Sequence, residues 1–584
     1  MCGSLLTHKA SEAGSIARSA VKAAVKRVQC KRKQVQAHEV RLKVKAKLFE
    51  KENRKYMKKL FLLAAVMLLS IGAKAQQMPE HIIKLMYAGN IIENFYVDDA
   101  DSDKITEEGI KAMLKTLDPH STYTDPKETK SLLEQMEGSF GGIGIQFNIV
   151  SDTLYVIQTT NNGPSERAGI LPGDRIIAVN DTAIAGVKMD RADIMSRLRG
   201  EKGTKVEIDV MRRGIDRKLH FSLVRDDIST ETVDVAYMID KKNGYIRINT
   251  FGAKTHDEFV TKLDSLKKCG MKNLILDLSG NGGGYLTAAV GIAGEFIDEA
   301  KLVVYTEGKK NPRFDYLSMG EGRFRKGNLV VIVDETSASA SEILAGAVQD
   351  WDRGIIVGRR TFGKGLVQRP FQLPDGSMIR LTIARYYTPT GRCIQKPYDN
   401  DSVKYEDDLL NRYNKGEMTS ADSIHFPDSL KTYTLRLQRP VYGGGGIMPD
   451  YFVPVDTARY TKYHRALAAK GSIIQTSLRY IDENREKLLA EYPTVDDFEA
   501  HFEVNDAFVE MLKQQGMMDS VKIEGGDEEF QRSLPEIKLQ LKQLVARDLW
   551  DMSDFMKLYN KNSDIFQKAY ELIKEKKFEE LMTK

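Results

Sequence analysis

The sequence predicts an α/β fold for the central part of the chain, with an inserted β-rich domain and helical regions at both ends. Between residues 227 and 456, apolar runs such as YIRINTF and LVVIVDE alternate with helical segments, and continuous apolar strands are typical of a sheet covered on both faces. Residues 137–226 instead show paired strand patterns with tight turns. Residues 76–136 and 457–584 repeat apolar residues at helical spacing.

Two further segments refine this organisation. Residues 397–440 are polar and irregular, and we interpret them as a cap or a flexible insertion in the central part. The sequence PFQLPDGSMIRL predicts a hairpin that turns at residues 374–376. The helical residues 457–584 are rich in Lys and Glu and contain no motif that indicates a task, so we expect an accessory domain there.

The first 75 residues differ in charge from the rest of the chain. They carry 18 Lys+Arg and 4 Asp+Glu, whereas the remaining residues carry 69 basic and 78 acidic side chains. A mildly acidic body gives no electrostatic footprint for nucleic acid. Residues 57–75 combine a basic start, an apolar run and a final Ala-Lys-Ala, which is typical of a secretory signal peptide.

We therefore expect an exported protein of the periplasm or cell envelope, whose mature chain begins near Gln76. The apolar run is shorter than the roughly 20 residues that span a bilayer. Membrane contact is expected only through proximity or through a signal that stays uncleaved. Residues 1–56 precede a plausible start, Met57, and are interpreted as a mis-assigned leader; a genuine basic arm is the alternative.

The cysteine and histidine residues predict no metal site and no cofactor. Cys2 and Cys30 lie in the leader, so at most one disulfide, between Cys269 and Cys393, would survive maturation. The nine histidines are scattered, and none lies in an HExxH motif.

Residues 137–226 contain two glycine-bearing segments at an informative distance. Gly142, Ile143, Gly144 and Ile145 form the first, and AGILPGD at residues 168–174 forms the second. Closely spaced glycines let successive backbone N–H groups converge on a terminal carboxylate, and the following strand edge can pair with the peptide. This region resembles a PDZ domain, which implies that the first segment binds substrate; a glycine-rich hairpin without a ligand is the alternative.

Residues 358–364, GRRTFGK, match the GxxxxGK pattern of nucleotide-binding loops. However, the next residue is Gly365, which offers no hydroxyl to magnesium, and strand-like sequence follows where a helix is needed. A nucleotide site is therefore not expected, and Lys364 is free for another role.

The segment SASASEILAGAVQD at residues 337–350 places alternating serines before a helical pattern. Ser337 fits a strand-to-helix turn and Ser341 fits a helix cap, whereas Ser339 could be a turn hydroxyl or a nucleophile. A buried lysine loses its proton more easily, so Lys364 could activate a serine without histidine. The unpaired N–H groups at the helix start could stabilise an oxyanion.

Over about residues 77–455 the chain resembles the carboxy-terminal processing peptidases, also called tail-specific proteases. The shared features, in the family's order, are LDPHS, the inserted PDZ domain, DLSGNGGG, SASASEILAGAVQD, TFGKGLVQ and GGGGIMPD. The resemblance implies an α/β protease core similar to the crotonase and tricorn-core folds, without a metal. It also implies a catalytic Ser339, a partner Lys364, and a Gln368 that orients the lysine.

The oxyanion donors are expected at the backbone of Ala340 and Gly283, since glycine-rich DLSGNGGG supplies a second backbone near the helix start. His120 in LDPHS is interpreted as a turn residue. Because an extended strand would separate Lys364 and Gln368 by about 13 Å, we expect a bent segment that brings the Gln368 amide oxygen to the lysine amine.

Two functions follow from these features. The first is an exported serine endopeptidase that recognises the accessible C-terminal tails of proteins through its PDZ domain and cleaves them with a Ser-Lys dyad. The second is a PDZ-bearing adaptor or inactive homologue that binds tails without cleaving them. The intact Ser339, Lys364 and Gln368 favour the enzyme, and the sequence leaves a homo-oligomer open.

Overall fold

The computed structural model describes residues 78–150, 152–398, 405, 407–523, 525–574 and 577–583. The predicted leader and signal peptide lie outside these residues. The chain divides into two compact units, one reaching Thr106 and one beginning at Glu107. None of the helices within the described ranges combines the length and apolarity that crossing a bilayer requires.

The first unit contains α2 (Glu80–Phe95) and the start of α3 (Ser102–Lys115). No residue of α2 is buried, although the helix presents large apolar side chains. In the second unit, α3 is followed by β1 (Thr122–Thr124) and α4 (Pro126–Glu137). The prediction of helices in residues 76–136 is therefore correct, apart from the short strand at LDPHSTYT.

The inserted domain is built on one antiparallel sheet with the order β3-β4-β5-β7-β8. Its core contains the buried side chains of Leu154, Ile176 and Ile208. β3 lies at the edge of this sheet, so one side of its backbone has no strand partner within the described part of the chain. The elements are β2 (Ser139–Gly142), β3 (Ile145–Val150), β4 (Thr153–Thr159), α5 (Pro164–Ala168), β5 (Arg175–Val179), β6 (Thr182–Ala183), α6 (Arg191–Leu198), β7 (Lys205–Met211), β8 (Leu219–Val224) and β9 (Asp226–Ser229).

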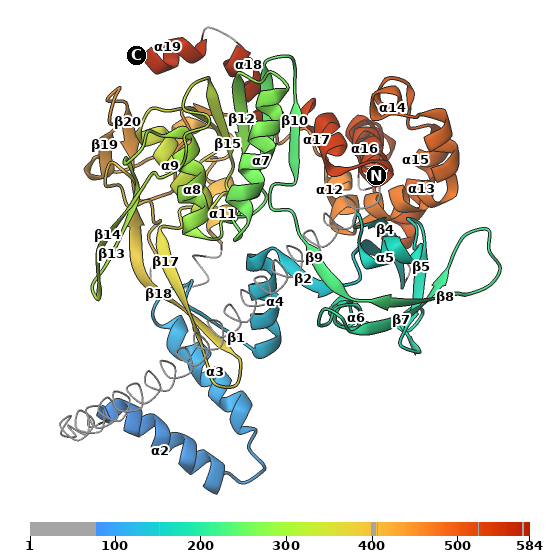
Figure 1. The fold of residues 1–584 in the computed structure, drawn as a ribbon, viewed down its shortest axis with the longest axis horizontal. Helices are drawn as coiled ribbons and strands as arrows, with labels where there is room; N and C mark the ends of the chain where they lie inside the picture. The colour runs from blue at the N-terminus through green and yellow to red at the C-terminus, as the bar shows by residue number, and fades with distance from the viewer. Residues whose placement is uncertain are drawn as a thin grey trace, which may run out of the picture. The chain divides into compact units, whose positions relative to one another are not determined.

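The central part contains a six-stranded sheet with the order β10-β11-β12-β15-β16-β21, in which all neighbours except the antiparallel β10 and β11 are parallel. Three helices pack on one face (Figure 1). The elements are β10 (Val235–Met238), β11 (Asn243–Arg247), α7 (Thr255–Lys268), β12 (Asn273–Asp277), α8 (Leu286–Phe296), β15 (Leu329–Val333), α9 (Ala340–Asp350), β16 (Ile355–Gly358) and β21 (Tyr451–Phe452).

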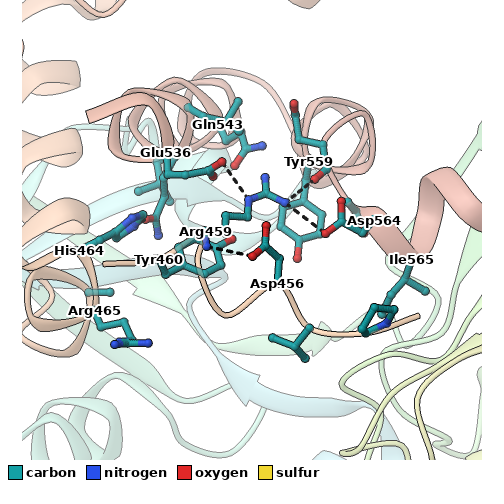
Figure 2. Close-up of a pocket in the computed structure, with 18 of the residues that line it drawn as sticks. Asp456, Arg459, Tyr460, His464, Arg465, Glu536, Gln543, Tyr559, Asp564 and Ile565 are labelled. Atoms are coloured by element: carbon teal, nitrogen blue, oxygen red, sulfur yellow. Dashed lines mark hydrogen bonds and ion pairs between the residues drawn. The ribbon is translucent and has the colours of Figure 1, made fainter. Parts of the chain in front are cut away.

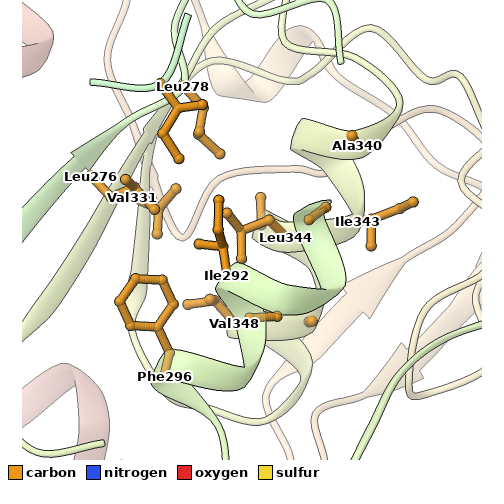
Figure 3. Packing of buried hydrophobic residues seen from close by; sticks show 14 of the residues in the cluster. Leu276, Leu278, Ile292, Phe296, Val331, Ala340, Ile343, Leu344 and Val348 are labelled. Atoms are coloured by element: carbon orange, nitrogen blue, oxygen red, sulfur yellow. The ribbon is translucent and has the colours of Figure 1, made fainter. Parts of the chain in front are cut away.

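The strands of this sheet are covered on both faces, as their continuous apolar sequences predict. In β12, Leu276 packs toward α8 and α9, where Figure 3 shows it near Ile292, Phe296 and Val331, whereas Ile275 joins a second apolar cluster on the opposite face. Both faces thus exclude water from the strands that carry the site.

The second face is covered by the end of the chain. α18 (Asp564–Lys574) contributes Phe566 and Leu572 to the cluster around Ile275. The expected accessory domain at residues 457–584 is therefore partly wrong, because its last helices complete the central core. The remaining helices have a separate apolar core; they are α12 (Lys462–Ala469), α13 (Ser472–Glu491), α14 (Val495–His501), α15 (Asp506–Met518) and α16 (Gly526–Leu549), followed by α17 (Met552–Asn560) and, after α18, α19 (Lys577–Thr583).

A second sheet, with the order β1-β18-β13-β14, lies in the central part and includes the predicted hairpin. In the polar insertion, residues 399–404 and 406 are outside the described ranges, and the rest forms short elements. The elements are β13 (Leu302–Gly308), β14 (Asn311–Leu317), β17 (Leu366–Gln372), β18 (Met378–Tyr387), α11 (Asp408–Asn414), β19 (Lys431–Tyr433) and β20 (Pro440–Tyr442).

Candidate active site

Gly283, Ser339 and Lys364 lie in loops that follow β12, β15 and β16, three adjacent parallel strands, while Ala340 begins α9 and Gln368 lies in β17. Because the carboxyl ends of parallel strands lie at one edge of a sheet, these loops meet there. Backbone hydrogen bonds join them: the Ala338 N–H donates to the Asn281 carbonyl at 3.0 Å, and the Phe362 N–H donates to the Ser337 carbonyl at 3.0 Å. The topology thus brings together segments about 25 to 60 residues apart.

Ser339 is the residue that precedes the first residue of α9, and its backbone is strained. Its φ of 54° and ψ of −111° lie outside the regions that non-glycine residues usually adopt. Gly283, with φ of +101°, packs against it so closely that an added Cβ would lie 2.7 Å from the Ser339 Cβ. Only glycine fits beside a serine held in this position.

The three serines have different environments. Ser337 and Ser341 are completely buried, and their hydroxyls donate to the carbonyls of Leu278 at 2.8 Å and Asn281 at 2.9 Å. Ser339 is partly exposed, forms a capping box with Glu342 at the start of the helix, and has a hydroxyl that donates no hydrogen bond among the described residues. The expectation that Ser341 caps the helix is wrong, because α9 begins at Ala340 and Ser341 already lies in its first turn.

The Lys364 amine and the Gln368 amide are in contact. Lys364 Nζ donates to Gln368 Oε1 at 2.8 Å, as the sequence predicts. The segment is less bent than expected, since β17 already begins at Leu366. The contact is possible because the pairing register shifts between Val367 and Gln368 and because the lysine side chain is long. Gln368 Nε2 donates to the His120 carbonyl, which leaves Oε1 to face the lysine.

The environment of Lys364 favours its neutral form. Burial, assisted by the positive charge of Arg380, lowers the pKa of the amine to about 8, while the charges of Glu342 and Asp118 oppose this shift. The shift has the direction expected from the sequence but does not reach the lower limit of roughly 5–6 found for buried lysines. An appreciable fraction of the amine is therefore unprotonated near neutral pH.

Glu342 connects the two candidate catalytic segments, a role that sequence reasoning missed. Its carboxylate is completely buried and accepts from the N–H groups of Ser339 (2.8 Å), Gly363 (2.7 Å) and Lys364 (2.9 Å) and from the Thr361 hydroxyl (2.5 Å). Burial raises its pKa to about 7, although these donors favour the charged form. An acid among the apolar residues of SEILAGAV was the signal in the sequence.

Two further residues support this arrangement. His120 lies in a turn, as predicted, where its N–H donates to Asp118 Oδ1 at 2.8 Å; its ring contacts the Tyr405 hydroxyl at 2.6 Å. Burial, followed by the charge of Lys364, lowers the pKa of His120 to about 4, so the ring is neutral at pH 7. The buried Tyr386 hydroxyl lies within hydrogen-bond distance of the carbonyls of Ser339, at 3.1 Å, and Lys364.

The candidate dyad has no direct contact in this state. Among the described residues, Ser339 Oγ and Lys364 Nζ share no hydrogen bond, and the amine donates to Gln368 Oε1 instead. The candidate oxyanion donors also differ from each other. The Ala340 N–H has no partner among the described hydrogen bonds, whereas the Gly283 N–H donates to Asn281 Oδ1 at 2.8 Å. A role for Gly283 as a donor therefore requires that bond to be shared or broken.

Gly142, Ile143, Gly144 and Ile145 line one cavity of about 270 Å³ beside the free edge of β3, with α6 on the other side. The Ile143 carbonyl accepts from the Ser165 hydroxyl at 2.7 Å and from its N–H at 3.0 Å, which fixes the glycine-bearing segment. The geometry suits a peptide added as a strand.

Other features of the described residues do not join these two sites. Cys269 and Cys393 are unpaired, and no cluster of metal-ligating side chains occurs in this part of the chain. A cavity of about 410 Å³ lies near α16 and α17; Figure 2 shows Arg459 within it, paired with Glu536 at 2.9 Å. None of the candidate residues lines that cavity.

Comparison with known proteins gives matches in three parts of the chain. Residues 242–403 match peptidase family S41, residues 141–223 match the PDZ domain, and residues 463–551 match a family of unknown function (DUF8443). The carboxy-terminal processing protease CtpA of Bacillus subtilis (strain 168) is 36% identical over 324 residues, which cover 55% of this chain and 68% of that protein.

Two other matches were found, one to a protein sequence and one to a solved structure. The carboxy-terminal-processing protease of Bartonella bacilliformis is 33% identical over 344 residues, covering 57% of this chain and 78% of that protein. The solved structure of a photosystem II D1 C-terminal processing protease is 26% identical and aligns with 65% of this chain and 94% of its own, with a TM-score of 0.32.

Proposed function

Because the chain belongs to the carboxy-terminal processing proteases, and is thus a serine-type peptidase with a PDZ domain, we propose that Ser339 and Lys364 are its catalytic dyad. The observation that carries this proposal is the buried Lys364 amine, which hydrogen-bonds to Gln368 and has a pKa lowered to about 8. The partly exposed and strained Ser339, at the start of α9, supports the assignment of the nucleophile.

In the proposed reaction, the neutral Lys364 amine accepts the Ser339 hydroxyl proton as Oγ attacks the carbonyl carbon of the peptide bond. The protonated amine then donates to the leaving nitrogen, the C–N bond breaks, and an acyl-enzyme remains. Water attacks this ester with the same amine as base, which releases the acid and restores Ser339.

The lysine can perform both roles without losing its contact with Gln368. A neutral amine keeps two N–H bonds and one lone pair, so one N–H can donate to Gln368 Oε1 while the lone pair faces Ser339 Oγ. Proton transfer needs these atoms within about 3 Å, and such contacts often tighten only when substrate binds. Rotation about the Lys364 side-chain bonds would supply the approach.

The start of α9 would stabilise the tetrahedral intermediate. The Ala340 N–H is unpaired and lies next to the nucleophile, which is the position an oxyanion donor requires. Gly283 is the second candidate, once Asn281 releases its N–H. Glu342 and Tyr386 act as positioning residues, because each contacts the backbone of both Ser339 and Lys364.

The PDZ domain would capture the C-terminal tail of the substrate at residues 142–145 and along β3. We further propose that the chain is exported to the periplasm or cell envelope, on the signal pattern at residues 57–75. N-terminal sequencing of exported protein tests this: a start near Gln76 supports it, and an intact Met1 contradicts it.

The decisive experiment incubates the exported protein with an unfolded substrate protein and follows fragments by mass spectrometry. We expect cleavage by the wild type and none by Ser339→Ala, with unchanged circular dichroism. If the wild type binds tails but never cleaves them, the chain is an adaptor and the proposed dyad is wrong.

A further inference from the structure

The groove of the PDZ domain contains a positive charge that has no ion-pair partner among the described residues. Arg191 is the first residue of α6, is exposed, and lines the groove cavity. Its guanidinium carbon lies 4.8 Å from the centre of the Phe147 ring, which belongs to β3 on the opposite wall. Among the described residues no carboxylate forms an ion pair with it.

The acids and the other arginine near this groove are already engaged. Asp190 accepts from the Ala192 N–H at 2.8 Å and caps the helix, and Asp193 faces Lys127 at 4.0 Å. Arg199, at the other end of α6, pairs with Glu134 at 3.3 Å and stacks on Phe140. The guanidinium of Arg191 is therefore the positive charge without an ion-pair partner, and it lies at one end of the groove.

The spacing of the groove determines which residue of a bound tail meets this charge. If the terminal carboxylate lies at residues 142–144, the tail runs antiparallel to β3, with its last residue beside Ile145. Side chains on one face of a strand recur about every 6.6 Å. The residue two positions earlier then lies beside Phe147, and thus under Arg191.

The helix on the other wall has the same spacing. Met195 lies one turn after Arg191, and helix side chains four residues apart are about 6 Å apart. The apolar Met195 and Leu198 therefore face the last side chain of the tail, while Arg191 faces the third from the end. The two walls agree on the register.

We propose that this PDZ domain selects protein tails with an apolar last residue and a carboxylate side chain, Asp or Glu, at the third position from the end, bound by Arg191. This inference rests on the proposed function only in that it assumes capture of tails at the groove. It does not depend on cleavage by Ser339.

The test measures peptide binding to the full chain carrying Ser339→Ala, so that nothing is cleaved. Labelled peptides ending in Glu-Ala-Val, Gln-Ala-Val and Lys-Ala-Val are compared by fluorescence anisotropy, together with a C-terminally amidated form of the first. A partly exposed ion pair predicts about threefold to fivefold tighter binding of the Glu peptide than of the Gln peptide. The Lys peptide should bind about tenfold more weakly than the Glu peptide.

Charge reversal provides the matched control. In Arg191→Glu the preference should invert toward the Lys peptide, whereas Arg197→Glu, an equal charge change at an exposed residue of the same helix outside the cavity, should keep the Glu preference. Equal binding of the Glu and Lys peptides, or the same effect from both variants, overturns the role of Arg191. If no peptide binds, or if amidation has no effect, tail capture itself is refuted.

Discussion

The strongest test of the proposed dyad is the pH dependence of kcat/KM, because it reports the protonation of the free enzyme. With a pKa of about 8, the Lys364 amine is about 9% neutral at pH 7, whereas an ordinary lysine with a pKa of 10.5 is about 0.03% neutral. Burial therefore raises the concentration of the active base about 300-fold at this pH. The expected profile rises nearly tenfold from about pH 6 to 7 and reaches a plateau above about pH 9.

Arg380 supplies the matched perturbation. Its positive charge helps to lower the Lys364 pKa, so Arg380→Gln should raise that pKa and move the acid limb to higher pH. Activity at neutral pH should fall, while the plateau at high pH should approach that of the wild type. The assay uses an uncharged fluorogenic peptide below KM, so that substrate titration does not contribute.

Two results would refute this reasoning. An acid limb centred near pH 6.5 that is independent of Lys364 would indicate a histidine base. An Arg380→Gln limb that moves to lower pH would show that Arg380 does not act on Lys364 through its charge. Glu342 has a pKa of about 7, so its titration also affects the rate near and below this pH. The acid limbs of the wild type and of Arg380→Gln are therefore compared above pH 7.

Three further predictions concern the same site. The pKa of Lys364 is lower in the folded state than in the unfolded state, so the unfolded chain binds more protons between about pH 8 and 10.5. Chemical denaturation at pH 7 should therefore find Lys364→Met up to about 3 kcal/mol more stable than the wild type. This difference in stability should disappear by about pH 10.5. Ser339→Ala should abolish proteolysis. Ser337→Ala and Ser341→Ala each lose one buried hydrogen bond, so they should keep most activity and lose about 1 kcal/mol of stability. An inactive Ser341→Ala together with an active Ser339→Ala would contradict the assignment of Ser339 as the nucleophile. Gln368→Ala should lower kcat much more than it raises KM, and an unchanged kcat would exclude its positioning role.

Several features of this protein could be predicted from local sequence patterns. The continuous apolar strands indicated a sheet covered on both faces, and the glycine pattern at residues 142–145 indicated the PDZ groove. The spacing of the serine and lysine segments, through the family resemblance, identified Ser339 and Lys364 as candidates. These inferences succeed because periodicity, turn chemistry and motif order are properties of short segments.

Other features depend on contacts between distant segments, which no local pattern encodes. The Glu342 carboxylate accepts donors from three residues about twenty positions later because the loops after β15 and β16 meet at one sheet edge. Gln368 donates to the His120 carbonyl although 248 residues separate them. The capture of the Gly283 N–H by Asn281 also follows from the folded loop rather than from its composition.

The sequence by itself therefore determined the family, the domain order and the candidate chemical groups. The tertiary structure decided which serine is accessible, which backbone N–H is unpaired, and how far the lysine pKa falls. It also decided that α18 completes the central core. The physical reason is that exposure, hydrogen-bond pairing and desolvation depend on everything packed around a group, and the parallel sheet brings those neighbours together from distant parts of the chain.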